Sequence, residues 1–119
     1  MINISNLNKS NYNKQYLNII SGIYGIYYNN LLYIGSSNNL FKRLSIHRHW
    51  IKMKEEDNIG FLLYNLLVYK YIRKYNIQDE ICFDIIYKSK YKINKNELLE
   101  LEQKYIIDFH PLCNKKLVH

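Results

Sequence analysis

The stretch GIYGIYYNNLLYIG, residues 22–35, decides the fold of this chain of 119 residues. Two apolar runs rich in Ile and Tyr flank Asn29-Asn30, and Asn tolerates the positive φ that a tight hairpin turn needs. The stretch therefore predicts two antiparallel strands joined at that turn. With the turn placed there, Tyr24 faces Gly35 across the hairpin.

The same register brings two tyrosines together. Ile26 faces Tyr33, so Tyr24 and Tyr33 are diagonal neighbours on one face. Gly35 has no side chain, which predicts a gap beside Tyr24 where a ligand can approach the backbone. In a chain with 13 tyrosines, ordinary cross-strand packing is the simpler interpretation of this pair on spacing alone.

The residues after the hairpin predict two helices. Asn38 or Asn39 can cap a helix that runs to about residue 56. A second helix, dense in Leu and Tyr, fits residues 59–75, and Asn76 suits a left-handed cap at its end.

A third strand and a last helix complete the expected fold. Residues 80–88 alternate and are rich in β-branched and aromatic side chains, which predicts a strand. Asn94 or Asn96 caps a helix that Pro111 ends. The order ββααβα predicts an α+β domain, a three-stranded antiparallel sheet flanked by helices.

Length and composition limit the chain to one small domain, residues 21–119, preceded by an Asn- and Lys-rich arm, residues 1–20, with one short helix or strand. With 48% apolar residues the domain can bury a core. No segment approaches the roughly 20 apolar residues of a spanning helix. We expect an intracellular protein without a membrane partner, in the cytoplasm or nucleoid of a bacterial host or in an organelle.

A net charge of +7 predicts a basic surface. The loop lysines Lys88, Lys90, Lys92 and Lys95, interleaved with Tyr91, are candidates for contacting a phosphate backbone. Asn, Ile, Lys and Tyr all have AT-rich codons, so a merely solvated loop explains these lysines equally well. The composition suits an AT-rich phage, mobile element or organelle.

The helix after the hairpin gathers a cation and an imidazole on one face. At about 100° per residue, His47 lies about 40° and Trp50 about 20° from Arg43. A guanidinium can meet a phosphate with a planar fork of donors. A surface arginine whose stem covers the core is the more ordinary interpretation.

The last helix carries a carboxylate, that of Glu102, where its pattern predicts burial. The residues within about 60° of Glu102 on the helical wheel are Leu98, Leu99, Tyr105, Ile106 and Phe109. A carboxylate among such neighbours needs an ion pair, a hydrogen bond or a metal. This singles out Glu102 among the acidic residues, and a buried structural salt bridge is the competing interpretation.

The triplets Gly22-Ile23-Tyr24 and Tyr33-Ile34-Gly35, separated by eight residues, resemble the signature of the GIY-YIG endonuclease superfamily. Arg43 and His47 follow at the positions where that family carries its catalytic Arg and a His or Tyr. The resemblance covers about residues 21–115.

Near the C-terminus, Glu102 resembles the family's metal-binding Glu, and Pro111 and Asn114 resemble its closing Pro and Asn motif. Ser36 stands where the excision-repair branch of the family carries Lys, which makes that branch the less expected one.

The resemblance implies a phosphodiesterase that acts on DNA with one divalent cation, Mg²⁺ or Mn²⁺. It implies that Glu102 holds the metal and that Arg43 counters charge growing on the phosphorane. Asn114 would hold the site together. The catalytic set implied is Tyr24, Tyr33, Arg43, His47, Glu102 and Asn114.

The same resemblance implies that Tyr24 or Tyr33, with His47 nearby, orients or deprotonates the attacking water. Which tyrosine is the base stays open, because a phenol with a pKa near 10 needs help to act at neutral pH.

We expect a standalone nuclease of low intrinsic specificity, or one directed by a homodimer, a partner protein or DNA structure. Three alternatives remain. They are a non-catalytic nucleic-acid-binding module of the same fold, a structure-specific or RNA-directed nuclease, and a purely structural interaction protein, which predicts neither binding nor cleavage.

Overall fold

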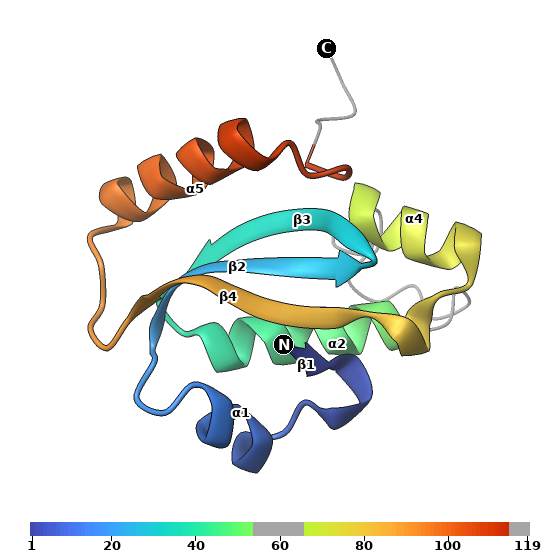
Figure 1. The fold of residues 1–119 in the computed structure, drawn as a ribbon, viewed down its shortest axis with the longest axis horizontal. Helices are drawn as coiled ribbons and strands as arrows, with labels where there is room; N and C mark the ends of the chain where they lie inside the picture. Colours follow the sequence, from blue (N-terminus) through green and yellow to red (C-terminus); the bar gives the residue numbers. More distant parts are fainter. Residues whose placement is uncertain (54–65, 115–119) are drawn as a thin grey trace.

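The structure, a computed structural model, describes residues 1–53 and 66–114 (Figure 1). Its elements are β1 (Ile2–Asn3), η1 (Ile4–Asn6), α1 (Lys9–Gln15), β2 (Ser21–Tyr28), β3 (Asn30–Ser37), α2 (Leu40–Lys52), α4 (Leu67–Tyr75), η2 (Gln78–Glu80), β4 (Cys82–Ser89) and α5 (Lys95–Phe109). The strands form one antiparallel sheet in the order β1-β4-β2-β3. In Figure 1, α5 covers one side of this sheet while α1 and α2 lie on the other.

The expected α+β class is confirmed, but the sheet has four strands instead of three. The additional strand, β1, is only two residues long and pairs with β4 at Ile2 and Asn3. A two-residue strand has too little alternation to be recognised in a sequence. It belongs to the stretch 1–20, expected as an arm, which contributes Ile4 and Tyr12 to the main core.

The central hairpin has the predicted register over most of its length. Tyr24 pairs with Gly35 and Ile26 pairs with Tyr33. A register shift after Ile26 then pairs Tyr28 with Asn30, so the turn narrows to Asn29 at φ 59°. The prediction of an Asn29-Asn30 turn is therefore wrong by one residue, because a bulge of this kind absorbs an extra residue without changing the residue pattern.

The helix caps follow the predicted chemistry. The side chain of Asn39 accepts a hydrogen bond from the backbone N–H of Lys42 at the start of α2. Helix α2 ends at Lys52, earlier than the predicted residue 56. Helix α4 ends at Asn76, whose φ of 54° is left-handed as predicted. The part of the second predicted helix in residues 59–65 lies outside the described residues.

The last helix, α5, begins at the predicted cap and ends just before the predicted breaker. The Asn94 side chain accepts hydrogen bonds from the N–H groups of Asn96 and Glu97. His110 adopts a left-handed conformation and stops the helix before Pro111.

Two apolar clusters lie on opposite faces of the sheet. The larger one joins Tyr24 and Ile26 of β2 to buried residues of α1, α2 and α4. The smaller one joins Ile23 and Ile34 to Leu98 of α5. This alternation along β2 aims Tyr24 at α2, while its neighbour Ile23 faces α5. Among the described residues no helix is long and apolar enough to cross a membrane.

Candidate active site

Tyr24 fills the space beside Gly35 that the sequence predicted to be a gap. Tyr24 is fully buried, and a Cβ atom added to Gly35 would collide with the hydroxyl end of its ring. The predicted approach route for a ligand is therefore wrong, because the large side chain of the facing residue folds over the glycine. Gly35 is needed here to let the Tyr24 hydroxyl pass across β3.

Beyond Gly35, the Tyr24 hydroxyl reaches His47 on α2. The Tyr24 oxygen lies 2.6 Å from Nε2 of His47, and Nδ1 of the same ring lies 2.7 Å from the hydroxyl of Tyr69 on α4. Burial lowers the pKa of His47 to about 3, and the charge of Arg43 acts in the same direction. His47 is therefore a neutral imidazole with one N–H at physiological pH.

Tyr33, unlike Tyr24, is only partly buried. Its ring centroid lies 6.3 Å from that of Tyr24 and 5.7 Å from that of His47. Burial raises its pKa, the negative charge of Glu102 raises it further, and the positive charge of Arg43 lowers it. The pKa of Tyr33 therefore depends on both the Glu102 carboxylate and the Arg43 guanidinium.

Arg43 contributes an exposed positive charge at this place. It makes no ion pair with any residue in the described ranges 1–53 and 66–114. Burial and Tyr33 raise the pKa of Tyr24 well above 10, and Arg43 opposes this shift by its charge and by a hydrogen bond. An exposed guanidinium without a carboxylate partner is suited to receive an anion.

Glu102 faces the sheet from α5. Its Oε1 accepts a 2.6 Å hydrogen bond from the hydroxyl of Ser36 on β3, and the residue is partly buried. The predicted apolar stripe around it is wrong at Leu99 and Phe109, which are 45% and 49% exposed. Helix α5 instead packs on the sheet through a narrower face that includes Leu98 and Leu101.

The salt-bridge interpretation of Glu102 finds no support in the part of the chain that the structure describes. Glu102 forms no ion pair there, and its Oε2 makes no hydrogen bond to the described residues. Mg²⁺ is typically bound by one or two carboxylates, with waters and substrate phosphates completing its shell. One half-buried carboxylate with a free oxygen fits such an ion. No group of three or more His, Cys, Asp or Glu side chains that could hold a metal ion gathers among the described residues.

Asn114 holds β3 from the C-terminal side of α5. Its Nδ2 donates to the carbonyl of Ile34 at 2.9 Å, and its Oδ1 accepts from the Ile34 N–H at 2.7 Å. Ile34 separates Tyr33 from Gly35, so this pair of bonds fixes the strand where it carries the site. The N–H of Cys113 also donates to the Leu32 carbonyl at 2.6 Å.

A second asparagine, Asn38, makes the equivalent pair of bonds before α5. Its amide donates to the carbonyl of Ile93 at 3.0 Å and accepts from the Ile93 N–H at 2.9 Å. The two pairs tie the segments before and after α5 to the residue that follows β3 and to the middle of β3.

Sequence reasoning missed Tyr69, Ser36 and the bridging role of Asn38. Tyr69 lies on the apolar face of α4, where its ring predicts core packing. The available signal is weak: a buried phenol must find a hydrogen-bond partner, but the sequence does not say which one.

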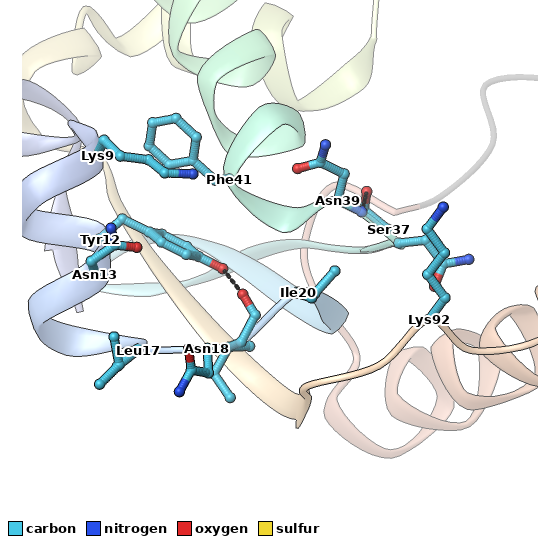
Figure 2. Close-up of a pocket in the computed structure, with 12 residues that line it drawn as sticks. Lys9, Tyr12, Asn13, Leu17, Asn18, Ile20, Ser37, Asn39, Phe41 and Lys92 are labelled. Carbon is cyan, nitrogen blue, oxygen red and sulfur yellow. Dashed lines mark hydrogen bonds between the residues drawn. The ribbon is translucent and has the colours of Figure 1, made fainter.

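The four candidate lysines, Lys88, Lys90, Lys92 and Lys95, are all exposed. Lys92 lines a hollow of about 710 Å³ between α1, the start of α2 and the loop before α5 (Figure 2). Lys9 and Phe41 line the same hollow, and Lys9 Nζ lies 4.9 Å from the Phe41 ring centroid. Its other polar residues are Ser, Asn and Tyr, and no carboxylate lines it.

No protein-family model matches the sequence, and no curated protein matches it. Among solved structures, the chain is similar to the GIY-YIG N-terminal endonuclease domain of UvrC from Thermotoga maritima. That domain bound to magnesium is 21% identical, with a TM-score of 0.45 over 91% of this chain and 99% of that one. Two point mutants of the domain, each bound to the catalytic divalent cation, are 20% and 21% identical, with TM-scores of 0.46 over 92% of this chain and 99% of theirs.

The solved structures to which the chain is similar are GIY-YIG endonuclease domains.

Proposed function

We propose that this protein is a divalent-metal-dependent DNA endonuclease of the GIY-YIG type. The observation that carries the proposal is the Glu102 carboxylate: Ser36 of β3 holds its Oε1 by a 2.6 Å hydrogen bond, and its Oε2 makes no hydrogen bond to the described residues. A phosphodiester hydrolase needs a cation site, a donor to the phosphate and a group for the attacking water. Glu102, Arg43 and Tyr33 are the residues that supply these three groups in this proposal.

A divalent ion held at Glu102, when bound, polarises a phosphate oxygen and offsets negative charge on the leaving group. Ser36 keeps one oxygen of Glu102 occupied, which orients the carboxylate. Arg43 donates to the non-bridging phosphate oxygens, where charge grows during attack.

Tyr33 is the phenol that meets the attacking water. Tyr24 has no exposed surface, and its hydroxyl is engaged by His47, so it acts on the water only through other groups. Tyr33 is partly exposed, and although burial and Glu102 raise its pKa, the charge of Arg43 opposes that rise. Tyr33 therefore orients the attacking water through its hydroxyl group, and His47 supports Tyr24 from the core side.

The hollow at Lys9 and Lys92 is proposed as the path of the DNA beyond the scissile phosphate. It lies next to Ser37–Asn39, the turn that connects β3 to the helix carrying Arg43. Two lysines and several amides without a carboxylate suit a polyanion. Lys88, Lys90 and Lys95 extend the same positive charge. Contacts of this kind position DNA without reading its sequence, which agrees with low intrinsic specificity.

The test is nicking of supercoiled plasmid with and without Mg²⁺. We expect nicking by the wild type that is lost in excess chelator, in Glu102→Ala and in Arg43→Ala. Arg48→Ala is the matched control, because Arg48 lies on the same helix but donates to the Leu7 carbonyl. Wild-type nicking that persists in chelator would overturn the proposal.

The same assay separates the alternatives. DNA binding without cleavage, across several divalent metals, would favour a non-catalytic binding module. A preference for branched DNA, single strands or RNA in a substrate panel would favour a structure-specific or RNA-directed nuclease. Since one metal site cuts one strand at a time, rapid double-strand cleavage would indicate a homodimer or a partner protein.

A further inference from the structure

Tyr69 is a buried phenol on α4 that contacts the candidate site through His47. Its side chain is 1% exposed, and its hydroxyl lies 2.7 Å from Nδ1 of His47. The two rings meet nearly edge-on, with centroids 5.8 Å apart. Within residues 1–53 and 66–114, Nδ1 is the one hydrogen-bond partner of this hydroxyl.

This single partner decides where the protons of the Tyr69 hydroxyl and the His47 ring lie. A buried hydroxyl proton needs an acceptor, and among the described residues the acceptor at hand for Tyr69 is Nδ1. If Nδ1 carried the proton of the ring, two hydrogens would face each other across 2.7 Å, or the Tyr69 proton would be left without an acceptor. Nδ1 therefore accepts, and the single N–H of the neutral imidazole lies at Nε2.

The direction of the next bond is then fixed as well. Nε2–H donates to the oxygen of Tyr24 at 2.6 Å, so the Tyr24 proton must point to a different acceptor. Arg43, whose charge acts on Tyr24, can only donate and so offers no acceptor. Tyr33 lies beside Tyr24, with ring centroids 6.3 Å apart, and its oxygen can accept the Tyr24 proton. Each group thus donates to the next, from Tyr69 in the core through His47 and Tyr24 to Tyr33. Tyr33 lies at the partly exposed side of the site.

We propose that Tyr69 is a positioning residue: its hydroxyl fixes His47 in the Nε2–H tautomer and thereby directs the Tyr24 proton toward Tyr33. Its effect on cleavage rests on the proposed nuclease function, but the tautomer does not. The logic is that of a third group that orients a catalytic imidazole. A phenol does this without a negative charge, so the imidazole stays neutral beside Arg43. A carboxylate in its place would favour a charged ring next to a guanidinium.

The first measurement is the long-range ¹H–¹⁵N spectrum of the His47 ring in uniformly labelled full-length protein. We expect the wild type to be the Nε2–H tautomer, with Nδ1 shifted by an accepted hydrogen bond. In Tyr69→Phe that shift is lost and the Nδ1–H form becomes populated. In Tyr71→Phe, a partly buried tyrosine of the same helix whose ring packs on Tyr75, the His47 signals stay as in the wild type.

The second measurement is Mg²⁺-dependent plasmid nicking at neutral pH. Loss of one neutral hydrogen bond corresponds to about a five- to tenfold drop in kcat for Tyr69→Phe, with KM for DNA unchanged. Tyr71→Phe stays within about twofold of the wild type.

A wild-type spectrum in which the proton of the His47 ring lies at Nδ1 overturns the proposal, even if Tyr69→Phe does not fold. An Nδ1 signal in Tyr69→Phe that equals the wild-type signal also overturns it, as does a Tyr69→Phe rate equal to that of Tyr71→Phe. A wild type that shows the Nε2–H tautomer but never nicks DNA overturns the nuclease function, and leaves the hydrogen-bond assignment standing.

Discussion

The Ser36 hydroxyl donates a 2.6 Å hydrogen bond to Oε1 of Glu102, joining β3 to α5 at the carboxylate proposed to hold the metal. Partners of this kind set the orientation of a ligating carboxylate. Ser36→Ala should therefore raise the Mg²⁺ concentration for half-maximal nicking by about 10- to 100-fold, while saturating Mg²⁺ restores most of the rate.

Glu102→Gln in the same titration keeps an oxygen for Ser36 but removes the charge, and no Mg²⁺ concentration should restore its rate. Glu100→Gln, an exposed neighbour on α5, serves as the matched control. A Ser36→Ala curve identical to the wild-type curve would show that the hydrogen bond does not act on the metal.

His47 should make the protein less stable in mild acid. Its pKa is about 3 in the folded state and 6.5 when unfolded, so below pH 6.5 the unfolded chain binds the extra proton. The contribution of His47 to the free energy of unfolding is complete above pH 6.5. It declines by about 1.4 kcal/mol per pH unit as the pH falls toward 3.

The measurement is urea unfolding at pH 5 and pH 7.5. Between pH 6.5 and 5 the wild type should lose about 2 kcal/mol more unfolding free energy than His47→Gln, whose side chain does not titrate. His49→Gln, at an exposed position of the same helix, should follow the wild type. Parallel pH curves for wild type and His47→Gln would contradict a buried neutral imidazole.

Gly35→Ala should displace the Tyr24 hydroxyl from His47. A Cβ atom at this position collides with the end of the Tyr24 ring, so the ring must move and its hydrogen bond to His47 must lengthen or break. We expect about 1–3 kcal/mol of destabilisation and a fall in nicking of at least about tenfold.

A double-mutant cycle isolates this collision. In a Tyr24→Ala background, Gly35→Ala should cost little stability, because the colliding ring is gone. Equal costs in both backgrounds would mean that Gly35 is required for another reason.

Lys9 and Lys92 should contribute to DNA affinity through phosphate contacts. The double variant Lys9→Glu with Lys92→Glu should bind DNA more weakly and flatten the plot of log K against log salt, by about one unit of slope per lost contact. Fluorescence anisotropy at several salt concentrations measures this. Lys104→Glu, exposed on α5, should leave the slope unchanged. If the double variant keeps the wild-type slope, the hollow lined by Lys9 and Lys92 does not contact the DNA.

Much of the fold could be predicted because local rules agree with the final structure. The hairpin register follows from strand alternation and turn chemistry, and the caps at Asn39, Asn76 and Asn94 follow from side-chain and backbone preferences. The bulge after Ile26 and the pairing of Ile2 with Phe83 depend on long-range packing. No local pattern encodes them.

In the candidate site too, features within one element could be predicted, while contacts between elements could not. Arg43 and His47 share a helix, so their common face could be computed from their spacing. Glu102 could be singled out as a carboxylate at an apolar position, but its partner Ser36 comes from a strand 66 residues earlier. The hydrogen bond between His47 and Tyr69 likewise joins two helices, and helix periodicity says nothing of how helices meet.

Residues 112–114 run along the outer side of β3, with Leu112 and Cys113 donating to the carbonyls of Leu31 and Leu32 and Asn114 bonding both groups of Ile34. They occupy main-chain groups that an outermost strand would otherwise offer to another polypeptide. Two copies of this chain are thereby discouraged from extending one continuous sheet through β3. Self-association is therefore expected through a different surface, and it would leave the partly exposed Tyr33 of β3 uncovered.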